Sequence, residues 1–325
     1  MVLLRSQSRS DSHQARDGTS WMPLANEFLP YFFAQVVNAL IISAIYALMA
    51  VGLTIIFGIM KIVNFAHGEL YMIGGYTAYF LITRVGLNPF LSILASAGIG
   101  FIVGSIIEKL FLKPIGLGRV ERPAEYSILI TFAISVFLRN MMIVIYPFTT
   151  GPPPYVPGKV TLGPLSVSGD RLLACLVSAI VLIFLMVFLY RTWTGRALRA
   201  VSQNRSMASA LGINPLRIDT IAFGLGSLMA ATAGALVAPV FLISPSMGAI
   251  PASKGYVIIV LGGMGSIKGS IIGSILLGLF ESLGSVLIPD PTRALAYRDV
   301  YGFLVLIIVL LLRPYGLFGE REREA

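Results

Sequence analysis

Three polar side chains lie close together in an otherwise apolar part of the chain and are the first candidates for chemistry. The sequence there reads Lys61-Ile-Val-Asn64-Phe-Ala-His67-Gly-Glu69. The amide of Asn64, the imidazole of His67 and the carboxylate of Glu69 could bind a polar solute. Alternatively, the segment is a re-entrant loop whose side chains only satisfy backbone groups freed by a helix break. Both interpretations are open, and we predict a translocation pathway lined by Asn64, His67 and Glu69.

Two further charges, Arg139 and Glu281, lie deep within apolar runs. A charge at the centre of a membrane span costs about 2.5–3.5 kcal/mol, so both side chains must face protein or water. An ion pair between them, or between Arg139 and Glu69, would make them structural. Alternatively, they line the path of a zwitterion, and we include both, with Gly262 and Gly263, among the predicted pathway residues.

Several kinds of chemistry are not supported by the sequence. Residues 263–269, Gly-Met-Gly-Ser-Ile-Lys-Gly, are similar to a phosphate-binding loop, but Ile267 stands where that motif needs a glycine before Lys268. The chain has one cysteine and two histidines, so we expect no metal site and no cofactor. No spacing typical of a catalytic triad or a nucleophile elbow is found, and we expect no enzymatic activity in this chain.

These residues must be positioned by helices inside a membrane. Of the 325 residues, 56% are hydrophobic and 12% are charged, which is more apolar surface than a soluble domain can bury. We therefore predict an all-α, polytopic membrane protein with about eight to ten membrane segments. The net charge of +9 indicates orientation in the membrane and contact with anionic headgroups of the lipid bilayer, and we expect no nucleic-acid partner.

A single membrane domain is expected over residues 28–318. Residues 1–27 are polar and rich in serine and arginine, and we expect a disordered tail. Residues 319–325 are rich in arginine and glutamate, and we expect a solvated cytoplasmic tail.

Apolar runs near both ends of this domain do not match whole crossings. The run 28–60 is too long for one crossing of about 20 residues, and the run 255–288 is interrupted by glycines at 262–266. Residues 55–60 are also similar to residues 259–264, although chance among many glycines and isoleucines explains this equally well. Paired glycine-interrupted segments are typical of transport sites, so we predict broken or re-entrant helices between residues 28 and 83, near 58–70, and again near 260–270.

The loop at residues 191–217 carries five arginines and no acidic residue. Short basic loops stay on the cytoplasmic side of a membrane, and the basic loop at 108–125, two spans earlier, agrees with this. Residues 202–211 are predicted to form a short helix that ends at Gly212 and is stopped by Pro215. A plain connector needs no helix, so the loop offers a folded cationic surface to a cytoplasmic partner or to lipid headgroups.

Four stretches of the chain resemble a known family. They are Ala47-Leu-Met-Ala-Val-Gly-Leu-Thr-Ile-Ile-Phe-Gly58, Asn64-Phe-Ala-His-Gly-Glu69, Gly195-Arg-Ala-Leu-Arg-Ala200 with Met207-Ala-Ser-Ala-Leu-Gly-Ile-Asn214, and Leu261-Gly-Gly-Met-Gly-Ser266. In order and spacing they are similar to the LivH-type permeases of branched-chain amino acid ABC importers. The resemblance runs from about residue 28 to residue 318 and leaves the N-terminal tail outside.

This resemblance implies a permease subunit in the bacterial inner membrane that moves small polar solutes, chiefly branched-chain amino acids, from periplasm to cytoplasm. Its partners would be a second, LivM-like permease, two cytoplasmic ATPase subunits and a periplasmic solute-binding protein. ATP hydrolysis would then belong to the ATPase subunits, in agreement with the missing phosphate-binding motif.

The resemblance also implies a coupling helix within residues 208–215, the element that docks into a groove on the ATPase. Small residues allow close approach, and arginines can meet acidic groups of a partner. The residues expected to contact the ATPase are Ala208, Ala210, Leu211 and Gly212, with Arg199 and Arg205 at the rim.

Two alternative functions are kept open. Relatives with similar motifs carry urea, short amides or other amino acids, and the residues do not decide among these solutes. An ion-coupled secondary transporter is a further alternative, but the sequence lacks the repeated acidic residues of a membrane-centred proton or sodium relay.

Overall fold

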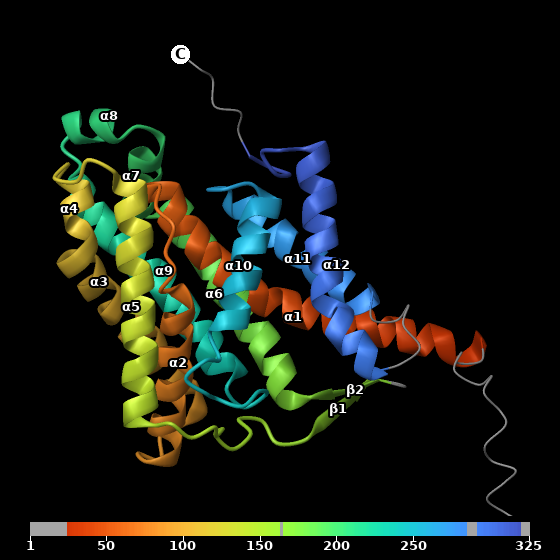
Figure 1. Cartoon of the computed structure of the whole chain (residues 1–325). Helices are drawn as coiled ribbons and strands as arrows, with labels where there is room; N and C mark the ends of the chain where they lie inside the picture. The colour runs from red at the N-terminus through yellow and green to blue at the C-terminus, as the bar shows by residue number, and fades with distance from the viewer. Residues whose placement is uncertain (1–24, 163–164, 285–290, 320–325) are drawn as a thin grey trace, which may run out of the picture.

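The computed structural model describes residues 25–162, 165–284 and 291–319, and these are mostly helical. Figure 1 shows the helices packed side by side, with α8 at one end of the molecule and the strands β1 and β2 toward the other. The prediction of an all-α protein is confirmed. The tails predicted at 1–27 and 319–325 lie almost wholly outside the described residues.

The elements in chain order are α1 (Ala25–Met60), α2 (His67–Thr83), α3 (Pro89–Ile107), the π-helical turn η1 (Glu108–Leu112), α4 (Lys113–Gly116), α5 (Pro123–Ile145), β1 (Lys159–Leu162), β2 (Leu165–Ser168), α6 (Gly169–Arg191), α7 (Trp193–Gln203), α8 (Arg205–Ala210), α9 (Pro215–Val237), α10 (Ala249–Gly262), α11 (Ile267–Gly284) and α12 (Pro291–Leu312).

Within the described residues, six helical stretches are long and apolar enough to cross a membrane. They are formed by α1, by α3 with η1 and α4, and by α5, α6, α9 and α11. The helix α10 and the last part of α12, Asp299–Leu312, are shorter but also apolar. These features confirm the prediction of a polytopic membrane protein. Few side chains of α5 and α6 are buried, and many of the exposed ones are apolar, which suits helices that face lipid or another subunit.

Helix α9 lies at the centre of the helical layer, where α1, α2 and α3 pack against it. Glycines make this close packing possible. A Cβ at Gly234 of α9 would lie 1.9 Å from the carbonyl oxygen of Tyr71 on α2. A Cβ at Gly226 would lie 2.6 Å from the carbonyl oxygen of Gly52 on α1. Small residues that let helix backbones touch are typical of packing inside membranes.

The chain between residues 28 and 83 forms two helices, and α1 continues without interruption to Met60. The break predicted near residues 58–70 is present as the link between the two helices, whereas α1 itself is one long helix. Its interior glycines, Gly52 and Gly58, lie against α9 and against the α10–α11 turn, and these contacts stabilise helix at positions that glycine would weaken in solvent. The helix stops at Lys61, whose φ of 56° is left-handed.

Residues 61–66 link α1 to α2 without regular structure. In Figure 1 this link leaves α1 at the end of the molecule that carries α7 and α8, and α2 begins part-way toward the opposite end. The start of α2 therefore lies among the helices rather than at a surface, and His67 and Glu69 are both buried there.

The break predicted within residues 255–288 is present between α10 and α11. Gly263 and Gly265 there have φ values of 100° and 89°, a conformation that glycine adopts readily. The segment after α12 covers this break, because Leu317 and Phe318 donate their backbone N–H groups to the last two carbonyl oxygens of α10, each over 2.9 Å. Figure 1 shows that the break lies toward the same end as α8.

The segment between α5 and α6, described over residues 146–162 and 165–168, includes the antiparallel pair β1–β2 and lies at the end opposite α8. Tyr155 anchors it, since its buried hydroxyl donates to the carbonyl oxygen of Ala235 on α9 over 2.9 Å. Burial raises the pKa of the Tyr155 hydroxyl. The carboxylate of Asp170 accepts the backbone N–H groups of Tyr155 and Val156 over 2.8 and 2.9 Å. These contacts fix the segment on α6 and α9.

Candidate functional site

The arginine-rich loop is largely helical and is ordered by local caps. Asn204 ends α7, and its side chain accepts the backbone N–H of Met207 over 2.9 Å, which caps α8. Gly212 has a φ of 83°, the left-handed conformation that closes a helix. Pro215 is the first residue of α9, so the prediction that it stops a helix is wrong. Its fixed φ and missing N–H suit the first position of a helix.

The short helix α8 presents apolar side chains on its outer face. Met207 and Leu211 are 65% and 82% exposed, and their spacing of four residues puts them on one side of the helix. Ala210 and Gly212 are also exposed. Ala208, predicted as a contact residue, is buried and faces inward. Exposed apolar side chains of this kind are typical of surfaces that contact another protein or a membrane.

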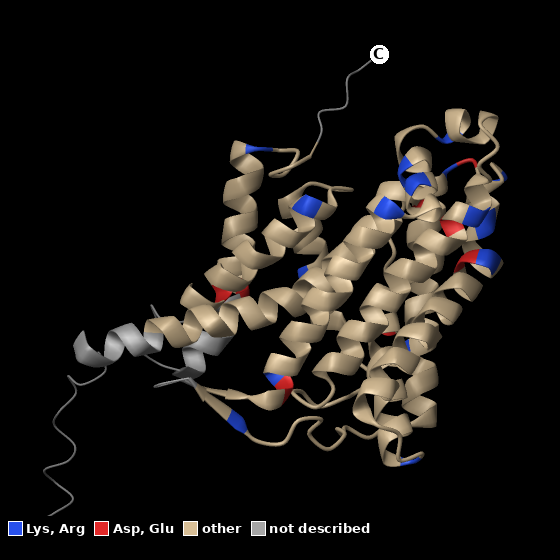
Figure 2. Ribbon diagram, turned by 180° about the vertical axis from the view of Figure 1, so that it is seen from behind, with Lys and Arg blue, Asp and Glu red and all other residues tan. Residues whose placement is uncertain are grey.

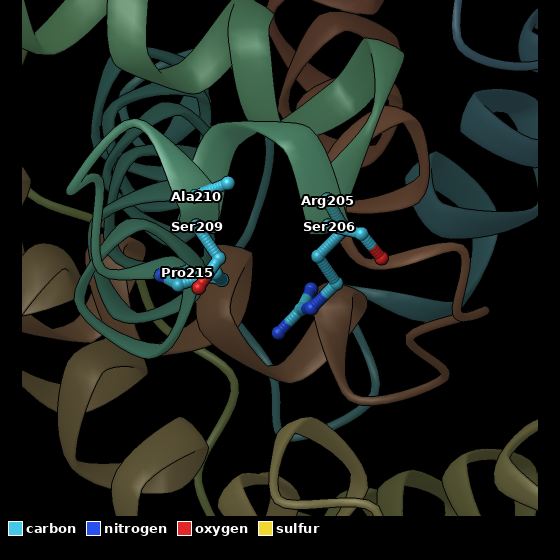
Figure 3. Close-up of a pocket in the computed structure, with 5 residues that line it drawn as sticks. All are labelled: Arg205, Ser206, Ser209, Ala210 and Pro215. Carbon is cyan, nitrogen blue, oxygen red and sulfur yellow. The ribbon is translucent and has the colours of Figure 1, made fainter.

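A cavity of about 450 Å³ opens between α8 and the start of α9. It is lined by Arg205, Ser206, Ser209, Ala210 and Pro215, shown in Figure 3. The Arg205 side chain extends away from α8 in that view. Its guanidinium pairs with both carboxylate oxygens of Asp219 on α9, with Nη1 3.0 Å from Oδ1. Arg205, predicted at the rim to meet an acidic partner, therefore already has one within its own chain.

Lysine and arginine residues gather at the end of the molecule that carries α7 and α8, and Figure 2 shows few at the opposite end. Two of them lie on aromatic rings. The guanidinium of Arg199 lies 4.7 Å from the ring centre of Tyr190, and that of Arg196 lies 5.5 Å from the ring of Trp193. Such cation–π contacts hold the arginines in place while their charge stays exposed, so α8 stands within a cationic surface.

The link between α1 and α2 carries the predicted pathway residue Asn64 and is held by two other helices. On α10, the Tyr256 hydroxyl donates to the carbonyl oxygen of Asn64 over 2.5 Å. On α5, the Thr131 hydroxyl accepts the backbone N–H of Phe65 over 3.1 Å. The side-chain nitrogen of Asn64 is buried and has no hydrogen-bond partner in the described part of the chain.

Glu69 and Arg139 form an ion pair between α2 and α5, with 2.8 Å between Oε1 and Nη2. The Ser135 hydroxyl donates to the same carboxylate oxygen over 2.9 Å. Glu69 is buried, whereas the Arg139 side chain is 40% exposed. The imidazole Nε2 of the buried His67 lies 3.2 Å from the carbonyl oxygen of Met49. Among described groups, Glu69 Oε2, Arg139 Nε and His67 Nδ1 are buried with no hydrogen-bond partner.

A second group of charges joins α10, α11 and α12. The buried ammonium of Lys254 contacts the carboxylate of Glu281 and lies 2.7 Å from Oδ1 of Asp299. The Tyr46 hydroxyl on α1 donates to the other oxygen of Glu281 over 3.2 Å. Glu281 is fully buried, whereas the Asp299 side chain is 61% exposed. The alternative of an ion pair between Arg139 and Glu281 is therefore wrong, because each has a different partner.

Comparison of the sequence with those of known proteins assigns the chain to a family. The family model described as the permease component of branched-chain amino acid transport systems matches residues 35–310. The chain is 35% identical to the high-affinity branched-chain amino acid transport system permease protein BraD of Pseudomonas aeruginosa, over 90% of this chain and 98% of BraD. It is 33% identical to LivH of Escherichia coli, over 93% of this chain and 99% of LivH.

The chain belongs to this permease family. The permease is thus a multi-pass membrane protein of a transport family. It is also 26% identical to LivM of Escherichia coli, described as a permease protein of a high-affinity branched-chain amino acid transport system, over 85% of this chain and 68% of LivM.

The permease brings some of the predicted pathway residues together and separates others. Glu69 contacts Arg139, and both lie near the link that carries Asn64. Glu281 belongs to the separate group around Lys254. The glycines at 262 and 263 form the helix break toward the α8 end, where they pack on the segment after α12.

Sequence reasoning missed two buried partners, Lys254 and Asp219. Each stands at the edge of an apolar run, where a charged residue is typical of the end of a membrane span. A usable signal was present at Lys254. It interrupts a sequence that is otherwise free of charge from residue 220 to Lys268, and a buried lysine needs a nearby carboxylate, which Glu281 supplies. No comparable signal distinguishes Asp219 from a surface residue, because its burial depends on how α9 packs.

Proposed function

We propose that this permease forms an ABC importer with a second, LivM-like permease, two cytoplasmic ATPase subunits and a periplasmic solute-binding protein. The importer lies in the bacterial inner membrane and moves branched-chain amino acids from periplasm to cytoplasm. Membership of the family supports this proposal, as does the similarity to both LivH and LivM. Two related permeases named for one kind of system favour a pair of different subunits.

The observation that carries the proposal is the geometry of α8. At the end of a membrane domain, the capped helix of six residues exposes Met207, and Leu211 directly after it is also exposed. The loop that holds both residues carries five arginines. A transporter that works alone has no need of such an element, whereas an ATPase groove fits an exposed apolar face with a cationic rim. The gathering of basic side chains at this end also favours its cytoplasmic orientation.

The pathway for the solute runs beside the Glu69–Arg139 ion pair. Buried polar atoms normally have hydrogen-bond partners, so the unpaired atoms of Glu69, Arg139 and Asn64 point to water or solute as the missing partner. Arg139 is half-exposed on α5, one of the least buried helices, and this exposure supports a position of the group beside a second subunit. A zwitterionic amino acid carries one charge for each member of the pair.

Movement at α8 reaches the pathway through the helix breaks. ATP-driven closure of the ATPase pair displaces residues 202–215, and the interrupted segments near 58–70 and 260–270 rearrange in response. The contact between Gly58 at the end of α1 and Gly265 in the α10–α11 turn supports this coupling, because a Cβ on Gly58 would lie 3.5 Å from Gly265. The two interruptions therefore meet near the cytoplasmic end.

Co-purification followed by ATPase assays tests the proposal. The complete transporter is purified in detergent, and ATP hydrolysis is measured with its binding protein empty or loaded with leucine, isoleucine, valine, urea or a short amide. We expect the ATPase subunits to purify with the permease and the branched-chain amino acids to stimulate hydrolysis most. A Leu211→Asp variant should lose the ATPase subunits, whereas Val85→Asp at the opposite end should keep them. Uptake by the purified chain alone would contradict the proposal.

A further inference from the structure

The ion pair between Arg205 and Asp219 attaches the coupling helix to the core of the membrane domain. Arg205 is the first residue of α8, and Asp219 lies in the second turn of α9. Each guanidinium Nη atom contacts one carboxylate oxygen of Asp219, Nη1 with Oδ1 and Nη2 with Oδ2, a paired geometry that fixes orientation as well as distance. The Arg205 side chain is 38% exposed, whereas Asp219 is almost fully buried. The pair thus reaches from the surface of α8 into the protein.

A third segment closes around this pair. Gly116, at the end of α4, leaves no room for a side chain, because a Cβ there would lie 2.6 Å from Leu216, 3.2 Å from Asp219 and 3.3 Å from Arg205. The residue after Asp219 is also held, since the Thr220 hydroxyl donates to the buried carboxylate of Glu108 over 2.5 Å. Glu108 begins the π-helical turn η1, a kind of irregularity that often marks functional sites in helices.

The helix that carries Asp219, α9, is the one best placed to pass a displacement on to other helices. α9 is packed against α1, α2 and α3 through backbone contacts at glycines, and these leave little freedom for α9 to move alone. Tightly packed interiors shift between discrete arrangements rather than deforming gradually. A shift at the first turns of α9 therefore changes the packing of α1 and α2. These two helices hold the link with Asn64 between them, and α2 carries Glu69.

We infer that the Arg205–Asp219 pair is the latch through which movement of α8 is transmitted to α9, with Glu108 and Thr220 holding the receiving end. Arg205 is thus a positioning residue that acts through Asp219, rather than a contact for an acidic group on the ATPase. This inference rests on the proposed function, because it assumes that α8 is moved by an ATPase. Removing the latch should leave ATPase docking and ATP hydrolysis in place while uncoupling them from transport.

The test compares transported solute with hydrolysed ATP in proteoliposomes that contain the complete transporter. Arg205→Ala removes the latch, Arg205→Lys keeps the charge but loses the paired geometry, and Asp219→Asn keeps the shape of the buried partner without its charge. Arg217→Ala is the matched control, since Arg217 is an exposed arginine two residues before Asp219 on the same helix. Co-purified ATPase is measured for each variant.

We expect Arg205→Ala to keep the ATPase subunits and to lower the ratio of leucine transported to ATP hydrolysed by about tenfold, a usual size for coupling between sites. Arg205→Lys and Asp219→Asn should give intermediate ratios, and Arg217→Ala the wild-type ratio. An unchanged ratio in both Arg205→Ala and Asp219→Asn would overturn the latch. Loss of the ATPase from Arg205→Ala but not from Arg217→Ala would also overturn it, because Arg205 would then be a docking contact. Failure of the wild-type transporter to couple ATP to uptake would instead refute the proposed function.

Discussion

The packing of α2 on α9 gives the sharpest prediction about the fold. Gly234 on α9 faces the backbone of α2, and replacing it with alanine adds a single methyl group. The added Cβ would lie 1.9 Å from the carbonyl oxygen of Tyr71, whereas real Cβ atoms essentially never come within 3.0 Å of another heavy atom. The two helices must therefore separate by about 1.1 Å, the difference between these distances.

The energetic cost follows from what lies on each side of the contact. Overpacking an interior typically costs about 1–3 kcal/mol, and here both sides are helix backbone that cannot rotate away, so the upper end applies. The better helix propensity of alanine offsets up to about 1 kcal/mol of this. We expect a net loss of about 2 kcal/mol in the free energy of unfolding.

Thermal unfolding of the purified permease in detergent measures this loss. The matched control is Gly98→Ala on α3, where a Cβ would find no atom within 4 Å. We expect Gly234→Ala to unfold at a clearly lower temperature than wild type and Gly98→Ala to equal or slightly exceed it. If both variants unfold at the same temperature as the wild-type protein, α2 and α9 do not make this close contact. If both are destabilised alike, the effect does not come from that contact.

Three further predictions concern the candidate sites. Gly212→Val puts a β-branched residue at a φ of 83°, which costs about 1–2 kcal/mol locally. We expect this variant to insert into the membrane normally but to co-purify with less ATPase. Full coupling of ATP hydrolysis to uptake in this variant would contradict the role of α8. Glu69→Gln leaves Arg139 without its ionic partner. Because the Arg139 side chain is 40% exposed, we expect the free energy of unfolding, measured by thermal unfolding, to fall by about 1–3 kcal/mol, less than for a fully buried pair. Unchanged stability would show that the pair is not structural. Lys254→Met removes the ammonium that neutralises Glu281 and should lower the free energy of unfolding by about 3–5 kcal/mol. The double variant with Glu281→Gln should regain most of this stability in the same assay. A double variant no more stable than Lys254→Met would argue against the ion pair.

Features that depend on local chain chemistry could be predicted from the sequence. The glycines of the α10–α11 turn and the glycine that closes α8 have left-handed φ values, so their positions alone indicate where helices end. The basic loop and its cap residues likewise predict a short helix in the part of the chain where the structure has α8. The ion pair of Glu69 with Arg139 was one of two alternatives, because a buried charge demands a partner but does not specify which one.

Features that depend on packing could not be predicted. A helix of six residues is too short for its apolar spacing to define an inward face, so Ala208 was expected outside and Met207 was overlooked. Pro215 can follow one helix or start the next, and only the position of α9 decides between them. The interruption near 58–70 could be predicted, but the unbroken length of α1 could not, because it depends on glycine contacts with α9 that stabilise it as one helix.

The central claim is that this permease imports amino acids only when an ATPase acts on α8. Its most direct test is the initial rate of labelled leucine uptake into proteoliposomes that contain the complete transporter and loaded binding protein, with ATP supplied to the ATPase side. We predict uptake that needs both ATP and the ATPase subunits and that falls to background in the Leu211→Asp variant. Equal uptake without the ATPase subunits, or driven by an ion gradient in place of ATP, would contradict the claim.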